Sequence, residues 1–379
     1  MADEAKSVVV RGLEGVIAGE TRVGYVDGVN GHLYFAGYEI NELAGKVCYE
    51  EVVYLLHHNE LPNQKQLTAL RKELIAEMEL PAPMLEWFKR VPKKTHPMAL
   101  LRSAVSDLSM YDPDAEDPSL EANKRKALRL IAKIPVIIAG YHRIAEGAEI
   151  LKPDPKKSLP ENFLRMFLGR ELVKEEIEAI GLMFVLHAEH DFNASTFAAR
   201  VTASTLADVY AAITSAIATL QGPLHGGANQ RVMEMLTDIG SPDDVDEYLD
   251  GMLNRREKIM GFGHREYKVE DPRARHLRKV SARLCERDRA CHYYKMSELI
   301  ERKVVKEKGI FPNVDFYSAT VQHALGIPVR YYTTIFAASR IAGWTAHVLE
   351  QLADNKLMRP RSFFAGAWPR KFVPLNKRK

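Results

Sequence analysis

Strand-forming sequence is confined to the first 35 residues of this 379-residue chain, and that restriction decides which folds are open to it. Short β-rich segments at 8–10, 22–26 and 32–35 are separated by glycine and Asp-Gly turns, a pattern typical of strands. Downstream, apolar residues recur at helical spacing until glycine or proline ends each run. The sequence therefore predicts a mainly α fold with a few short N-terminal strands.

Several helices carry boundary signals of their own. Asn63 and Gln66 form a candidate capping box ahead of an apolar helical stripe. Gly227 marks the expected start of another helix, and we expect two more over 295–308, before Gly309, and over 334–353. These signals predict where helices begin and end but not how they pack.

Chain length and the positions of glycine and proline predict two domains. A chain of 379 residues with 46% apolar residues exceeds one ordinary domain and can bury a large core. Helical periodicity breaks at Gly222-Pro223 and again at Gly326-Ile327-Pro328. We therefore expect a small domain over 223–328 and a discontinuous large domain made of 1–222 and 329–379.

Charge and cysteine content narrow the possible partners and location. A net charge of +3 does not indicate wholesale nucleic-acid binding, and no apolar run is long enough to span a bilayer. The start of the chain shows no apolar signal region. Cys48, Cys285 and Cys291 form no CxxC pair and no even framework, which favours a reducing cytoplasm.

Two histidines stand among glycines, where the backbone can approach a ligand closely. His225 lies within Gly222–Asn229, and His264 lies within Gly261–Arg265. The amides of the helix that follows Gly227 should lie beside His225 and favour its neutral form. Each histidine alone could merely cap a helix, but the pair predicts acid–base chemistry.

A carboxylate and several basic residues complete the candidate site. Asp315 stands between apolar residues, where it is either a turn or N-cap residue or a catalytic base. Asp271-Pro272 predicts an N-cap and a first helical residue, which puts Arg273 in a helical first turn. Because a cation there is unfavourable for the helix dipole, Arg273, with Lys268 near it, suggests an anionic ligand.

Arg340 lies within the apolar stretch 331–352, so burial would require an anionic partner. That partner could be a structural carboxylate or a substrate carboxylate.

A metal site is the main competing hypothesis. His187 and His190 are three residues apart, close to Glu189 and Asp191. A zincin helix needs its histidines four residues apart, and no cysteine stands nearby. A satisfied buried histidine therefore explains this cluster better than a metal ligand does.

Five motifs in order resemble the citrate synthase family. They are Gly222–Asn229, Gly261–Arg265, Asp271–Arg273, Pro312–Ser318 and Ser339–His347. Leu13–Val16 and Asp27-Gly28 also fit, so the resemblance spans nearly the whole chain. The compact length is similar to that of the archaeal and Gram-positive type, which includes 2-methylcitrate synthases. One departure lies at Tyr34–Tyr38, where the family often has an arginine, and it affects local N-terminal contacts.

The resemblance implies a mainly helical homodimer whose large and small domains close over acetyl-CoA and oxaloacetate. It implies that Asp315 is the base that removes a methyl proton from acetyl-CoA. It implies that His225 binds the enol oxygen and that His264 polarises and protonates the oxaloacetate carbonyl. These roles agree with chemistry, since a thioester enolate needs a base and an oxyanion donor at once.

The resemblance also implies the substrate ligands. His190, Arg273 and Arg340 match oxaloacetate ligands, and Arg359 matches an arginine that the partner subunit contributes to a shared active site. The expected CoA contacts are Lys258, Met260, Gly261, Phe262, Gly263, Lys268, Lys306 and Lys308. No metal and no cofactor is expected, since acetyl-CoA is a substrate. The alternatives left open are propionyl-CoA as the acyl donor, a metal hydrolase built on His187 and His190, and a non-catalytic helical scaffold.

Overall fold

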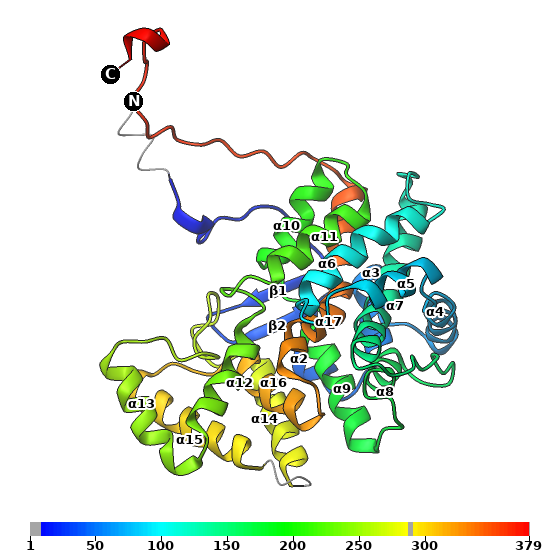
Figure 1. The fold of residues 1–379 in the computed structure, drawn as a ribbon, viewed down its shortest axis with the longest axis vertical. Coiled ribbons are helices and arrows are strands. Elements are labelled where there is room, and N and C mark those ends of the chain that lie inside the picture. Colours follow the sequence, from blue (N-terminus) through cyan, green and yellow to red (C-terminus); the bar gives the residue numbers. More distant parts are fainter. Residues whose placement is uncertain (1–8, 287–290, 379) are drawn as a thin grey trace. The chain divides into compact units, whose positions relative to one another are not determined.

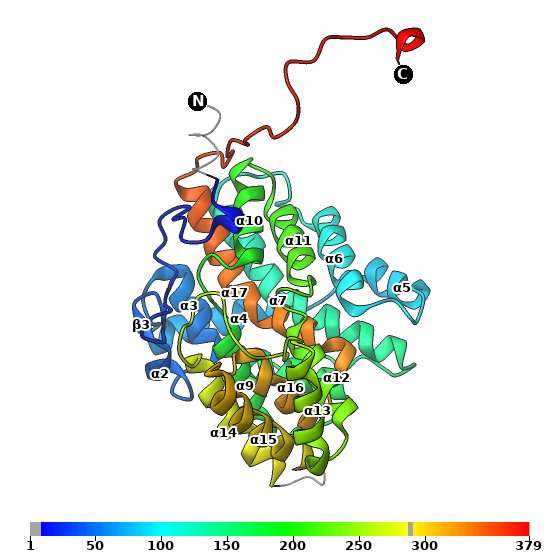
Figure 2. The same cartoon turned by 90° about the vertical axis from the view of Figure 1, so that its left-hand side faces the viewer.

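The computed structural model describes residues 9–286 and 291–378. Contacts divide the chain into two units, one of residues 21–356 and one that combines residues 1–20 with 357–379. The larger unit is an assembly of helices with one small sheet (Figures 1 and 2). The predicted mainly α fold is confirmed.

The sheet is an antiparallel meander in the order β1-β2-β3. Its strands are β1 (Gly24–Asp27), β2 (His32–Phe35) and β3 (Tyr38–Glu39). The strand predicted at 22–26 starts two residues later, and the one at 32–35 is confirmed. The expected strand at 8–10 is wrong for Val9 and Val10, while Val8 lies outside the described residues. β3 was missed because two residues are too few to show alternation.

The first half of the helical unit is built from short helices around one long one. Asn63 caps α4: its side chain accepts a hydrogen bond from the Gln66 amide at 3.0 Å. The Gln66 side chain in turn accepts one from the Asn63 amide, so the capping box is confirmed. The helices are α2 (Ile40–Leu43), α3 (Tyr49–His58), α4 (Gln64–Ala76), α5 (Ala82–Arg90), α6 (Pro97–Leu108), α7 (Leu120–Ala145), α8 (Leu159–Leu168), α9 (Lys174–His187), α10 (Ala194–Ser204) and α11 (Val209–Leu220).

The second half supplies the helices that carry most of the candidate residues. They are α12 (Ala228–Ile239), α13 (Val245–Asn254), α14 (Pro272–Cys285), α15 (Cys291–Lys308), α16 (Val314–Ala324) and α17 (Tyr332–Ala353). Helices α12 to α16 gather at one end of the larger unit (Figures 1 and 2). α17 is buried over nearly its whole length and packs against α7, α10, α11, α3 and α9. It is therefore the central element of the core.

The helix boundaries agree closely with the sequence signals. The helix expected after Gly227 begins at Ala228, and Gly309 follows α15 with a left-handed φ of 63°. α15 begins at Cys291 rather than at 295, and α17 begins at Tyr332 rather than at 334. No observation tests the predicted domain boundaries at 222/223 and 328/329, which remain a prediction.

The described part of the smaller unit is nearly free of regular structure. It contains two short 3-10 helices, η1 (Arg11–Leu13) and η5 (Leu375–Lys377), and the larger unit adds η2 (Ser109–Tyr111), η3 (Pro242–Asp244) and η4 (Val329–Tyr331). Many of its side chains are exposed, including Phe364, Trp368 and Phe372. None of the helices described here is long and apolar enough to cross a membrane.

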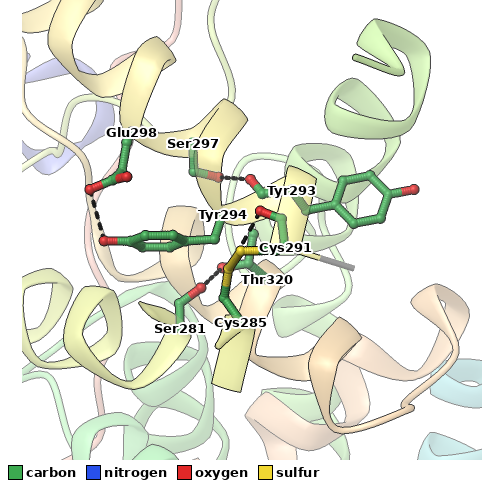
Figure 3. The surroundings of a disulfide bond; sticks show 8 residues. All are labelled: Ser281, Cys285, Cys291, Tyr293, Tyr294, Ser297, Glu298 and Thr320. Carbon is green, nitrogen blue, oxygen red and sulfur yellow. Dashed lines mark hydrogen bonds between the residues drawn. A yellow bond between two sulfur atoms is a disulfide. The ribbon is translucent and has the colours of Figure 1, made fainter. Parts of the chain in front are cut away.

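A disulfide joins Cys285 at the end of α14 to Cys291 at the start of α15. Figure 3 shows the bond beside the Ser281–Thr320 hydrogen bond, which links α14 to α16. The interpretation that the cysteines form no framework is therefore wrong for Cys285 and Cys291, and Cys48 alone is free among the described cysteines. Sequence spacing could not reveal the pair, because six residues apart matches no common motif.

Candidate active site

The second glycine-rich loop is fastened to the start of α16. Gly263 donates its N–H to the Phe311 carbonyl at 3.0 Å, and Asn313 donates its N–H to the Gly261 carbonyl at 2.8 Å. Gly261 has a φ of 80°, and a Cβ there would lie 2.9 Å from the Phe316 side chain. Glycine is required at this position, and the bonds bring the His264 loop next to Asp315.

Asp271 connects two of the predicted site helices. Its Oδ1 caps α14 by accepting the Arg273 amide at 3.0 Å, and its carboxylate pairs twice with the Arg273 guanidinium. Its Oδ2 also accepts the Val314 amide at 3.1 Å, one residue before Asp315. One buried carboxylate therefore fixes the start of α14 relative to the start of α16.

Arg273 lies in the first turn of α14, as predicted, and is buried. Burial opposes its charge, but the Asp271 carboxylate holds the pKa of Arg273 above its ordinary value. The anion expected to offset this cation at a helix start is thus supplied in part by Asp271. Any carboxylate ligand would add to that pair.

The ring of His264 is held in one tautomer. Its Nδ1 accepts two backbone N–H groups, from Glu266 at 3.0 Å and from Tyr267 at 3.2 Å. An atom that accepts these bonds carries no proton, so the neutral ring has its proton on Nε2. Burial lowers the pKa of His264 to about 4, so at neutral pH it is an uncharged donor.

His225 is held in the opposite tautomer. Ser195, at the start of α10, donates its backbone N–H to Nε2 of His225 at 3.3 Å, and its Oγ lies 2.8 Å from the same atom. The proton of the neutral ring is then on Nδ1. Burial lowers the pKa of His225 to about 4, with the Arg340 charge adding to the effect. The predicted neutral form is explained by burial and Arg340 rather than by the amides that start α12.

Asp315 is the second residue of α16, and Asn313 is the N-cap, so the interpretation of Asp315 as an N-cap is wrong. The Oδ1 of Asp315 is buried and has no hydrogen-bond partner among the described residues. Burial raises the pKa of its carboxyl to about 7, against the opposing charge of Arg273. A carboxyl with that pKa can take a proton and release it near neutral pH.

Arg340 is fully buried in the middle of α17. Its Nε donates to the His187 carbonyl at 2.6 Å, while Nη1 and Nη2 have no partner among the described residues. The guanidinium stacks over Phe336 at 4.8 Å. Burial lowers the pKa of Arg340 to about 10, and the Glu189 charge opposes this shift. Two buried, unpaired donors beside an aromatic face suit a carboxylate ligand.

His190 lies against His264, with ring centroids 5.1 Å apart. Its Nε2 lies 3.2 Å from the Tyr267 hydroxyl, and the Nδ1 of His187 lies 2.8 Å from the Met183 carbonyl. Both histidines thus bond to protein groups. Among residues 9–286 and 291–378, no group of three or more His, Cys, Asp or Glu side chains is arranged to hold a metal ion.

The predicted CoA contacts lie around the same loop. Met260 and Phe262 are partly buried in it, and the side chain of Ile310 lies 3.5 Å from where a Cβ on Gly263 would stand. The four lysines are all exposed, two of them at the end of α15: Lys258, Lys268, Lys306 and Lys308. Arg359 is exposed and belongs to the smaller unit, so the structure does not place it relative to this site.

Sequence reasoning missed three residues that shape the site. Sequence patterns offered no reason to connect Ser195 or Tyr267 with the candidate histidines, and they predicted Asp271 only as an N-cap. Ser195 and Tyr267 act on histidines far away in sequence. Asp271 has a second function, because it also binds the Val314 amide. A tyrosine three residues after a candidate histidine was the one available signal.

Comparison with known proteins agrees with this geometry. A family model described as "Citrate synthase, C-terminal domain" matches residues 12–361. "Citrate synthase 2" of Bacillus subtilis is 46% identical over 369 residues, covering 97% of this chain and 99% of that protein. "Citrate/2-methylcitrate synthase" of the same organism is 41% identical over 364 residues, covering 96% and 98%.

A solved structure of citrate synthase from Thermoplasma acidophilum, in a ternary complex with carboxymethyl coenzyme A and oxaloacetate, has the same fold. It superimposes with a TM-score of 0.92 at 31% identity, covering 98% of this chain and 99% of that one.

Proposed function

The chain belongs to the citrate synthase family, and from this premise we propose that Asp315, His225 and His264 share the work of one condensation. Acetyl-CoA, oxaloacetate and water react to give citrate and CoA. The observation that carries the assignment is that Oδ1 of Asp315 and both Nη atoms of Arg340 are buried without a described partner. The two side chains are close enough for each charge to shift the pKa of the other. The Asp315 carboxylate suits a base, and the Arg340 guanidinium suits a carboxylate substrate.

In the first step, the Asp315 carboxylate takes a proton from the methyl group of acetyl-CoA. The electron pair left on carbon is shared with the thioester oxygen, which needs a hydrogen-bond donor. His225 provides that donor through Nδ1–H, because Ser195 occupies Nε2. A neutral imidazole suits this role. The pKa of its N–H lies closer to the pKa of an enol than the pKa of an imidazolium does.

In the second step, the enol carbon forms a bond to the ketone carbon of oxaloacetate. The ketone oxygen gains negative charge and takes the proton of His264 Nε2, whose other nitrogen is held by two amides. Water then cleaves the thioester, which releases CoA and leaves citrate. Arg273, Arg340 and His190 hold the oxaloacetate carboxylates, since paired guanidinium groups fix the orientation of a dicarboxylate.

The direct test is release of free thiol from acetyl-CoA. Release should require oxaloacetate and should be indifferent to a chelator; release without oxaloacetate, or loss of it on chelation, would revive the hydrolase hypothesis. The same assay with propionyl-CoA tests the second candidate, 2-methylcitrate synthesis, which the similarity to the dual-named Bacillus relative favours. One added methylene changes discrimination by only about 1–3 kcal/mol, so both donors can serve one site.

The pH dependence of the reaction should report the Asp315 carboxyl. Burial raises its pKa to about 7, whereas the pKa values of His225 and His264 are lowered to about 4. The base must be ionised, so kcat/KM for acetyl-CoA should fall tenfold per pH unit below about 7. The two histidines stay neutral across that range. An acid limb centred near 4 would assign the loss of activity to a histidine instead.

We propose that the enzyme is a homodimer whose sites are shared through Arg359. The support is the family match and a segment with eight basic residues and no acidic one after Asp354. Two inactive variants, Asp315→Asn and Arg359→Ala, are mixed and allowed to exchange subunits. In a mixed dimer one site carries both defects and the other carries neither, so about a quarter of all sites should recover. No recovery, or full activity of Arg359→Ala alone, would refute the sharing.

The exposed lysines around the 260–263 loop are proposed to meet the CoA phosphates, since ammonium groups bind phosphate as point charges. No cofactor is proposed, because acetyl-CoA is itself a substrate. We propose a cytoplasmic enzyme; the disulfide is compatible with this location in hyperthermophiles, whose intracellular proteins are rich in disulfides.

A further inference from the structure

Tyr267 lies between the two histidines that the proposed function assigns to oxaloacetate. Its side chain is 4% exposed. Its ring centroid lies 4.7 Å from that of His264 and 5.5 Å from that of His190. Its hydroxyl lies 3.2 Å from His190 Nε2, and its amide donates to His264 Nδ1. One residue thus contacts both rings through different groups.

The bond between Tyr267 and His190 holds the ring whichever nitrogen carries the proton. Burial lowers the pKa of His190 well below its ordinary value, so the ring is uncharged at neutral pH. A neutral imidazole has one N–H and one acceptor nitrogen, and a tyrosine hydroxyl both donates and accepts, so it pairs with Nε2 in either tautomer.

We propose that Tyr267 is a positioning residue that fixes the ring of His190, so that the two act as one unit in oxaloacetate binding. This inference rests on the proposed function. Without the hydroxyl, Nε2 of His190 would lose its described hydrogen-bond partner inside a buried site, and the ring would be free to turn toward other partners. His264 would keep its two amide bonds, because those come from the backbone.

Tyr267→Phe removes the hydroxyl and keeps the ring contacts. The KM for oxaloacetate should rise about tenfold, which corresponds to the loss of one buried hydrogen bond. The kcat should change less than about threefold, since His225, His264 and Asp315 are untouched and uniform binding is lost. The KM for acetyl-CoA should not change.

The matched control is Tyr141→Phe. Tyr141 is 1% exposed and its hydroxyl donates to the Thr95 carbonyl, so the control also loses one buried tyrosine hydrogen bond. Both variants should melt at a lower temperature than the parent chain, and only Tyr267→Phe should weaken oxaloacetate use. A purely structural Tyr267 would show the drop in melting temperature with oxaloacetate KM unchanged, and that result overturns the inference.

A double-mutant cycle with His190→Gln tests whether Tyr267 acts through His190. In the His190→Gln background, Tyr267→Phe should change the KM for oxaloacetate less than about twofold. Additive effects would mean that Tyr267 acts independently and would overturn the inference. Calorimetric titration with oxaloacetate repeats the cycle without turnover. Absence of turnover in the parent chain would therefore refute the proposed function while this comparison still decides the role of Tyr267.

Discussion

Asp315→Asn is expected to lower kcat by about 10²–10⁴-fold while the chain stays folded. Asparagine keeps the size and hydrogen-bonding reach of the side chain but cannot take a proton at neutral pH. The buried, unpartnered Oδ1 of Asp315 has no evident structural duty, which makes the loss catalytic rather than structural. Steady-state turnover with both substrates saturating measures it directly, and near-normal turnover would show that another group is the base.

The stability of Asp315→Asn distinguishes a catalytic loss of activity from a structural one. The folded pKa of about 7 is raised above the ordinary value of 3.8, so ionisation is disfavoured in the folded chain. The parent therefore loses stability as pH rises from about 4, and the loss is complete above about 7. At pH 8 the variant should melt no lower than the parent. The control is Asp107→Asn. Asp107 lies on α6, and burial raises the pKa of its carboxyl too, but this variant should keep full turnover.

Arg340→Leu should raise the KM for oxaloacetate by about 10–100-fold or more, with little effect on acetyl-CoA binding. The expected size reflects the loss of charge-assisted bonds from two buried nitrogens that have no described protein partner. Leucine suits the apolar surroundings within α17, and removing a buried charge without its own carboxylate pair should not unfold the chain. Oxaloacetate titration by calorimetry and steady-state kinetics both report the effect.

Arg200→Leu is the matched control for Arg340. Arg200 is also buried, but its Nη1 bonds to Glu350 at 2.7 Å and contacts His347 at 3.3 Å. Its loss should lower the melting temperature and leave the KM for oxaloacetate intact. If Arg340→Leu instead behaves like Arg200→Leu, Arg340 is half of a structural pair and not a substrate ligand.

Local signals predicted the elements well because each depends on a few neighbouring residues. The capping box of Asn63 and the Asp271-Pro272 start of α14 are satisfied within one turn of helix. The clustering of His264 with Asp315 is different, since it depends on backbone bonds between 261–263 and 311–313. Spacing along the chain carries no record of such bonds; the order of the family motifs alone suggested them.

Tautomers and buried contacts lay beyond sequence reasoning. Ser195 decides which nitrogen of His225 carries the proton, and it is 30 residues away. Tyr267 reaches His190 across 77 residues. The Cys285–Cys291 bond requires the end of α14 to meet the start of α15, which only packing decides. The sequence shows which groups are present, whereas tertiary structure determines what each of them can donate.

The most direct test of this account follows the acetyl carbon to its product. Acetyl-CoA labelled with ¹³C at the methyl group is incubated with oxaloacetate and the enzyme, and ¹³C NMR identifies the labelled product. If the proposed condensation takes place, the label appears in a methylene of citrate, with one citrate formed for each CoA released. Labelled acetate in place of citrate would show thioester hydrolysis without carbon–carbon bond formation, and would contradict the assignment of Asp315 as the base that makes the enol.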